Sequence, residues 1–134
     1  MIGLPQEELV NWIKDKMTVD EMSVLETNKE IISKFIGITK DGKSILLVDK
    51  AKLNGQQMIV LYLIGKFMSK LAGYANQANT KNIEIAGSLG IPPGTVGRCL
   101  RELENAGTIS RSEKGGYEII LSSLPTFLST LRGV

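Results

Sequence analysis

Residues 37–44 read GITKDGKS and satisfy the phosphate-loop pattern G-x-x-x-x-G-K-[ST], with Gly37, Gly42, Lys43 and Ser44 in the signature places. In a phosphate loop, backbone amides at the start of a helix cradle the phosphates, and the lysine and the hydroxyl complete the site. The chemistry would then be ATP binding. The residues on either side of the pattern decide between that chemistry and an ordinary turn.

The flanking residues favour a turn. Asp41-Gly42 is a strong hairpin signal, because both residues tolerate the positive φ of a type I′ turn, and residues 36–40 and 43–48 are rich in apolar and β-branched types. A phosphate loop requires a helix to begin at its Lys-Ser pair, whereas the strand-like run ILLV follows that pair here. The chain also lacks the alternation of strands and helices that builds a parallel sheet beneath such a loop. We therefore predict a β-hairpin and no ATP site.

The composition argues against most metal and nucleophile chemistry. The chain has one cysteine and no histidine. A structural zinc site needs about four Cys or His ligands, and a Ser-His or Cys-His mechanism needs a histidine base. We therefore expect a protein that is not an enzyme and that uses no metal or other cofactor.

Length and hydropathy indicate a small cytoplasmic protein. The chain has 134 residues, of which 43% are hydrophobic, which suits one small domain with or without an appendage. A single cysteine cannot form a disulfide within the chain, as is usual in a reducing cytoplasm. The longest apolar run, at residues 58–65, is far below the ~18 residues of a membrane span. The N-terminal residues MIGLPQEELV lack the basic start and the apolar stretch of a signal peptide.

The net charge of +2 is unevenly distributed. Residues 1–35 carry four Lys against seven Asp and Glu, and residues 36–80 carry six Lys against two Asp. Residues 81–121 hold five positive and five negative charges. No polybasic tail is present, so affinity for nucleic acid has to come from local geometry.

The spacing of apolar residues predicts two helices before the hairpin. Leu9, Trp12 and Met17, together with Ile13, recur at helical spacing through residue 17, and a second stripe runs from about 20 to 35. Each helix has a polar outer face and an apolar inner face, so each packs against the rest of the chain or against a second copy. We expect Trp12 to be a packing anchor. Residues 1–53 then form an N-terminal helical extension plus the β-hairpin.

A longer helix is predicted from Gly55 to about Leu71, with Asn54 as its N-cap. Its residues leave little polar face, so we expect it to be central and largely buried. Gly73 is the expected terminator. Residues 74–82 read as a polar connection.

Two short helices and a β-hairpin follow. The first helix, capped by Asn82 or Thr80, ends at Gly90, and the second runs from about 93 to 105 with Val96, Leu100 and Leu103 facing inward. Cys99 lies beside this stripe and reads as a small buried residue.

Strands at 108–112 and 117–121 flank a hairpin tip at 113–116. The pattern predicts a helix-turn-helix with a wing. The fold class is therefore α+β and mainly helical: a winged helix-turn-helix at residues 54–134, preceded by the extension and its additional hairpin.

The run EIAGSLGIPPGTVGRCLRELENAGTISR resembles the winged helix-turn-helix of prokaryotic, notably archaeal, transcriptional regulators. The family pattern is roughly E-L-A-x-x-L-G-I-[PS]-x-G-T-V-x-R-x-L-x-x-L-x-x-x-G-x-I, and the resemblance extends over about residues 54–132. The landmarks are met by Glu84, Ala86, Leu89, Gly90, Ile91, Pro92, Thr95, Val96, Leu100, Leu103, Gly107 and Ile109.

The resemblance implies that the helix at 93–105 enters the major groove of double-stranded DNA while the wing at 111–116 touches the backbone. Arg98 and Arg101 would then reach phosphates or a guanine edge, and Thr95 a phosphate or a base. Arg111 and Lys114 are the candidates on the wing. The alternative for both helix arginines is a solvated surface, with Arg98 paired to the residue four positions on, Glu102.

Charge and side-chain size leave two functions open. Gly97 places no side chain on the outward face, and Glu102, Glu104 and Glu113 put acid near it. A homodimer compensates for a weak electrostatic footprint by presenting two reading helices to successive grooves. The leading hypothesis is a DNA-binding transcriptional regulator. The alternative is a winged helix that docks a protein in a transcription or replication assembly.

The last segment, SSLPTFLSTLRGV, predicts a terminal helix. Ser122 or Ser123 would cap it, and Pro125 lies in its first turn. Such a helix either closes the core or pairs with its copy across a two-fold axis.

Overall fold

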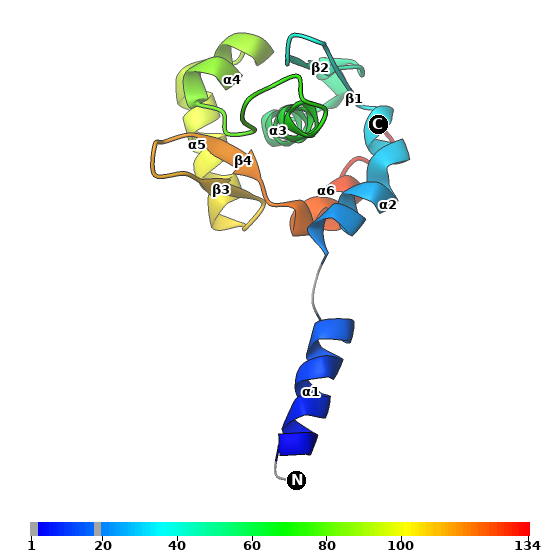
Figure 1. The fold of residues 1–134 in the computed structure, drawn as a ribbon. Coiled ribbons are helices and arrows are strands. Elements are labelled where there is room, and N and C mark those ends of the chain that lie inside the picture. Colours follow the sequence, from blue (N-terminus) through cyan, green and yellow to red (C-terminus); the bar gives the residue numbers. More distant parts are fainter. Residues whose placement is uncertain (1–2, 18–19) are drawn as a thin grey trace.

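The computed structural model describes residues 3–17 and 20–134, with side chains from residue 6 onward. The fold is α+β and mainly helical, as predicted, and its strands form two separate two-stranded antiparallel hairpins (Figure 1). The elements in chain order are α1 (Gly3–Lys16), α2 (Glu21–Ser33), β1 (Ile36–Ile38), β2 (Ser44–Leu46), η1 (Lys50–Lys52), α3 (Gly55–Leu71), α4 (Asn82–Leu89), α5 (Pro93–Asn105), β3 (Ile109–Arg111), β4 (Tyr117–Ile119), η2 (Leu121–Ser123) and α6 (Leu124–Ser129).

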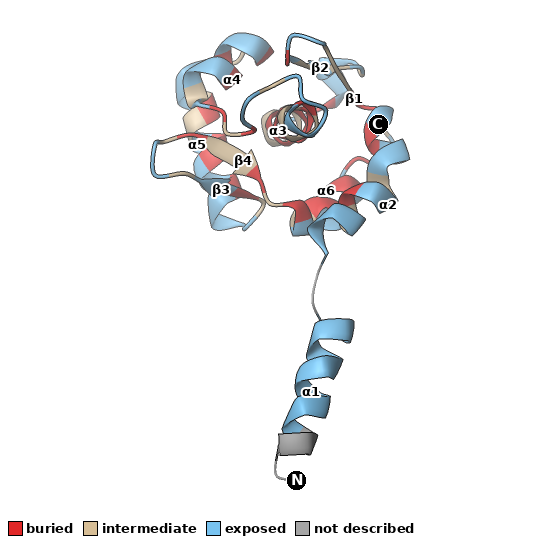
Figure 2. Ribbon diagram, viewed as in Figure 1, coloured by how far each residue is buried: buried red, intermediate tan, exposed pale blue. Residues whose placement is uncertain are grey.

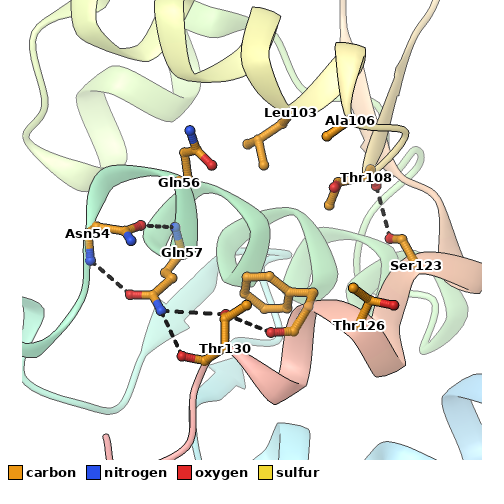
Figure 3. Close-up of a pocket in the computed structure, with 10 residues that line it drawn as sticks. Asn54, Gln56, Gln57, Leu103, Ala106, Thr108, Ser123, Thr126 and Thr130 are labelled. Atoms are coloured by element: carbon orange, nitrogen blue, oxygen red, sulfur yellow. Dashed lines mark hydrogen bonds between the residues drawn. The ribbon is translucent and has the colours of Figure 1, made fainter.

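Helix α3 is the centre of the fold. The elements from α2 to α6 surround it (Figure 1), and residues 59–65 are all buried (Figure 2). The predicted start at Asn54 is confirmed as a capping box: Asn54 Oδ1 accepts from Gln57 N at 2.8 Å, and Gln57 Oε1 accepts from Asn54 N at 2.9 Å. Gln57 Nε2 also donates to Thr130 O at 3.1 Å, which ties the start of α3 to the end of the chain (Figure 3).

The GITKDGKS segment is the predicted hairpin. Ile36 pairs with Leu46 and Ile38 with Ser44, so Ser44 begins a strand and not the helix that a phosphate loop needs. The predicted type I′ turn is wrong, because only Gly42 has a positive φ, +88°, and Asp41 does not. The loop is one residue longer than a type I′ turn allows, since the ladder ends where Thr39 N donates to Lys43 O at 2.9 Å.

This first hairpin packs directly on α3. A Cβ atom at Gly65 would collide with the Oγ and Cβ atoms of Ser44, so the hairpin reaches its position only because residue 65 has no side chain. Ser44 Oγ is buried there without a hydrogen-bond partner. The residue of the phosphate-loop pattern that would hold a magnesium ion is thus covered by the core helix.

Helices α2 and α6 cover another side of α3. Asp20 Oδ1 caps α2 by accepting from Met22 N at 3.1 Å, and Leu25 and Ile32 are buried. Helix α6 buries its own apolar residues against α2 and η2, so in this chain the terminal helix closes the core. Ser123 is the N-cap residue of α6, as predicted, but its side chain does not cap the helix. Its hydroxyl instead donates to Ile120 O at 2.6 Å and to Thr108 O at 3.2 Å.

Helix α1 lies apart from these elements (Figure 1). Every one of its described side chains, from residue 6 onward, is exposed (Figure 2). Trp12 is 54% exposed, so it anchors no packing against the described part of its own chain, and its expected role as a packing anchor is left to a second copy. Helix α1 was expected to pack either against the rest of the chain or against a second copy. The structure shows no packing against the described part of the chain. None of the helices in the described part of the chain is long and apolar enough to cross a membrane.

Candidate nucleic-acid interface

Helices α4 and α5 form the predicted helix-turn-helix. Gly90 ends α4 with φ +68°, and Gly90 N donates to Ala86 O at 2.9 Å. The inward residues of both helices are buried against α3, among them Cys99, as expected. The predicted cap of α4 is wrong: the N-cap residue is Lys81, whose ammonium group has no acceptor atom and makes no capping hydrogen bond.

The outward side of α5 carries the two predicted arginines. Arg98 and Arg101 are both exposed, and neither forms an ion pair with any residue that the structure describes. The alternative pairing of Arg98 with Glu102 does not occur, since Glu102 Oε2 accepts from Gln56 Nε2 at 2.5 Å. Two guanidinium groups are thus available to an external anion.

The first turn of α5 adds backbone donors. Pro92 is its N-cap residue and Pro93 its first residue, and no side chain caps the helix. The first intrahelical bond of this turn runs from Val96 N to Pro92 O at 3.0 Å. The amides of Gly94 and of half-buried Thr95 precede it, at the positive end of the helix dipole, where phosphates bind well in other proteins.

Gly97 belongs to the contact between α4 and α5. A Cβ atom there would lie 3.3 Å from Asn82 Nδ2, which itself donates to Pro93 O at 3.4 Å. Its missing side chain therefore lets the start of α4 approach α5, and does not leave a gap on the outward face as the sequence suggested.

The wing is the hairpin of β3 and β4. Ile109 pairs with Ile119 and Arg111 with Tyr117, and Lys114 is exposed at the tip. The Cζ atom of Arg111 lies 6.0 Å from the centroid of the Tyr117 ring, within the range of a cation–π contact. Strand β3 packs against α5, so wing and helix form one continuous side of the molecule (Figure 1).

The segment at 74–82 connects α3 to α4, as predicted, and it also pairs with the wing. Thr80 N donates to Tyr117 O and Tyr117 N donates to Thr80 O, both at 2.8 Å, so the segment forms a bridge to β4. Ala78 and Thr80 are buried, and a Cβ atom at Gly116 would collide with Asn79. Polar composition concealed this role, because the hydrogen bonds that satisfy it come from residues far along the chain.

Charges outside the 81–121 window alter the electrostatics of the interface. Lys66 Nζ of α3 lies 3.4 Å from Glu84 Oε2, and its side chain is only 14% exposed. Tyr62 Oη donates to the same oxygen at 2.8 Å and lies 3.1 Å from Ser88 Oγ. Burial raises the pKa of Tyr62 to about 12, so its hydroxyl remains a donor at neutral pH. One of the five acidic groups counted in the window is therefore balanced from α3.

Sequence reasoning missed Tyr62 and Lys66. The sequence analysis treated both as part of a largely apolar helix. They stand four residues apart and therefore share one face of α3. Two side chains with polar tips at that spacing on a buried helix were the available signal that α3 meets polar groups of another element.

A pocket of about 290 Å³ lies behind the end of α5 (Figure 3). Leu103 of α5 and its C-cap residue Ala106 form one side of it, and Gln56, Gln57 and Thr130 lie across from them. Its lining is uncharged, in contrast to the outward side of α5 with its two arginines.

The comparisons with known proteins agree with this geometry. Residues 75–110 match the family model described as winged helix-turn-helix DNA-binding. No curated protein and no solved structure matches the chain. The matched residues run from the bridge segment through α4 and α5 into β3. Together with β4, which follows the matched range, they have the fold of a winged helix-turn-helix.

Proposed function

We propose that the protein is a cytoplasmic transcriptional regulator that binds double-stranded DNA as a homodimer. The observation that carries this proposal is the pair of exposed arginines, Arg98 and Arg101, on the outward side of α5 in a segment that matches a DNA-binding family. An exposed guanidinium without an internal partner can form bidentate hydrogen bonds to a phosphate or to a guanine edge.

In this proposal α5 lies in the major groove. The amides of its first turn and the Thr95 hydroxyl bind a phosphate. Arg98 and Arg101, about one and two turns of α5 further on, bind phosphates or bases. Lys114 at the wing tip contacts the backbone, and Arg111, held near the Tyr117 ring, supports it. The proposal includes that the protein is similar to archaeal transcriptional regulators.

The homodimer follows from the charge of the interface. Even with Glu84 balanced by Lys66, exposed Glu104 and Glu113 lie on the same helix and wing as the basic groups. Non-specific affinity depends on the number of phosphates neutralised, so one copy binds weakly and two copies bind much more tightly.

A protein-docking function is the second candidate. Ile83 on α4 is 71% exposed, which makes it the most exposed large apolar residue among those described, and it follows the cap of the first helix of the motif. An apolar residue of this kind next to acidic side chains suits a protein partner better than a phosphate backbone.

Fluorescence anisotropy with random-sequence duplex DNA at about 50 and 200 mM salt tests the DNA proposal. We expect binding that weakens steeply with salt, and a double variant, Arg98→Ala with Arg101→Ala, whose slope of log K against log salt is smaller by roughly two for each bound copy, or roughly four for the homodimer. The matched control, Lys29→Ala with Lys70→Ala, removes the same charge from surfaces outside α4, α5 and the wing, and keeps the slope. Absence of binding at the lower salt would overturn the proposal and favour protein docking.

A further inference from the structure

Helix α1 carries an apolar stripe that no described residue of its own chain buries. Leu9, Val10, Trp12 and Met17 are 57, 41, 54 and 62% exposed, and we name them the α1 stripe. An isolated helix of about this length is marginal in water unless a surface covers its apolar side. The helix therefore needs a binding surface of matching chemistry.

A groove of that chemistry lies between α2 and α6. It has a volume of about 440 Å³, and buried Phe35, Leu128 and Leu131 line it. Ile31 of α2 also lines it and is 46% exposed. The groove thus combines buried core side chains with one exposed apolar side chain, and polar residues complete its lining.

The charges of the helix and the groove are complementary. Lys34 and Arg132 line the groove, and both are exposed without an ion pair to any described residue. Glu7 and Glu8 of α1 are likewise exposed and form no ion pair with the described part of the chain. At helical spacing, Glu8 stands one turn before Trp12 and Glu7 one turn before Val10, so the two carboxylates flank the α1 stripe.

We propose that α1 of each copy docks into the α2–α6 groove of a second copy, and that this reciprocal exchange forms the homodimer. The inference rests on the proposed function in one respect only: it supplies the dimer that the weak charge of a single winged helix calls for. The carboxylates flanking the stripe pair with Lys34 and Arg132, and Trp12 fills the groove.

The surface area that this exchange would bury is that of a stable dimer. Covering the exposed part of the α1 stripe removes on the order of 400 Å² from the helix, and two contacts counted on both partners bury about 1,600 Å², the size of a standard stable interface. A helix that folded back onto its own groove would bury half as much and would create no dimer. In the structure the groove is open, and α1 points away from α2 and α6 (Figure 1).

Analytical ultracentrifugation of the full chain over a range of concentrations tests the exchange. Wild type is expected to be dimeric, and Trp12→Ala is expected to weaken dimerisation by at least about 30-fold, because a buried tryptophan at an interface is a typical hot spot. Ile31→Glu, which changes an exposed residue, is expected to do the same. Asn11→Ala on the opposite side of α1 and Ser33→Glu on the opposite side of α2 are matched controls and remain dimeric.

A mixing experiment identifies the occupant of the groove. The Trp12→Ala chain keeps an intact groove and the Ile31→Glu chain keeps an intact helix, so the two together form a heterodimer through one arm–groove contact, although each alone is monomeric. Helix α1 pairing with α1 would leave Ile31→Glu as dimeric as wild type and would overturn the proposal. Fold-back within one chain would leave the mixture monomeric and would overturn it as well.

Fluorescence separates this inference from the proposed function. Trp12 is the only tryptophan, so its emission should shift to the blue as the protein concentration rises through the dimerisation range. A wild-type chain that is monomeric throughout overturns the docking. That result would not decide whether the protein binds DNA, because a monomer can still show salt-dependent binding in the anisotropy titration.

Discussion

The two β-hairpins of this protein are built on the same turn and serve different purposes. In the first, Thr39 N donates to Lys43 O at 2.9 Å, Gly42 N to Thr39 O at 3.0 Å and Lys43 N to Thr39 Oγ1 at 3.0 Å. In the wing, the same three bonds connect Ser112 with Gly116 and Gly115, at 2.8, 3.0 and 3.2 Å. Gly42 and Gly115 have φ values of +88° and +90°.

The surroundings of the two turns differ. The carbonyl of Gly42 accepts from Lys66 Nζ at 3.5 Å, and a Cβ atom at Gly42 would lie 2.6 Å from Tyr74 O. A Cβ atom at Gly115 would meet nothing within 4 Å. One tip is thus held against the body and the other is open to a ligand. The comparison shows that the sequence GITKDGKS encodes the conformation of a turn. Whether such a turn can bind a ligand depends on the residues that surround it.

The seat of the first hairpin gives the largest expected effect. Gly65→Ala would force the Ser44 side chain and its strand away from α3, and we expect the free energy of unfolding to fall by about 3 kcal/mol, as for overpacked cores. Urea unfolding followed by circular dichroism measures it. Gly87→Ala, on exposed α4 with open space around it, is the control and should leave stability equal or slightly higher. Equal losses in both variants would mean that the first hairpin is not seated on α3 as described.

Substitution of the two turn glycines tests the difference between the tips. Gly115→Ala should cost about 1 kcal/mol, the penalty of a left-handed residue, whereas Gly42→Ala adds a clash with a backbone oxygen and should cost about 2 kcal/mol or more. The same urea titration compares them. A greater loss for Gly115→Ala would contradict the assignment of the wing tip as the open one.

A smaller effect is expected at the network that holds the first tip. The pKa of Tyr62 is raised to about 12 by burial, so above pH 10 the unfolded state ionises first and the contribution of Tyr62 to stability is lost between about pH 10 and 12. Tyr62→Phe should cost about 1 kcal/mol at pH 7, through its lost hydrogen bonds, and should flatten the decline of stability between pH 10 and 12. Melting curves of both proteins at several pH values measure this, and parallel declines would refute the assignment.

Local sequence signals predicted much of the fold. The bounds of α3 and α5 and the position of the wing followed from apolar spacing, from the Asn54 cap and from the turn at Gly90 and Pro93, all of which depend on neighbours in the chain. The fold class was therefore accessible before any coordinates.

The remaining features depend on residues far apart. Thr80 was one of two expected caps of α4 and instead pairs with Tyr117. Ser123 occupies the N-cap position of α6, but its hydroxyl bonds to Thr108 O and does not cap the helix. A hydroxyl with several possible partners takes the one that tertiary packing provides, and local sequence does not contain that information. For the same reason, the balancing of Glu84 by Lys66 was invisible to a charge count along the chain.

The bridge between Thr80 and Tyr117 has a consequence for how the helix-turn-helix unfolds. Its two hydrogen bonds close a loop that contains both α4 and α5, so the start of α4 is tied to β4 of the wing. We expect α4, α5 and the wing to open as one cooperative unit in local unfolding. Their backbone amides would then exchange with solvent at a common opening free energy, and the outward side of α5 would be lost together with the wing.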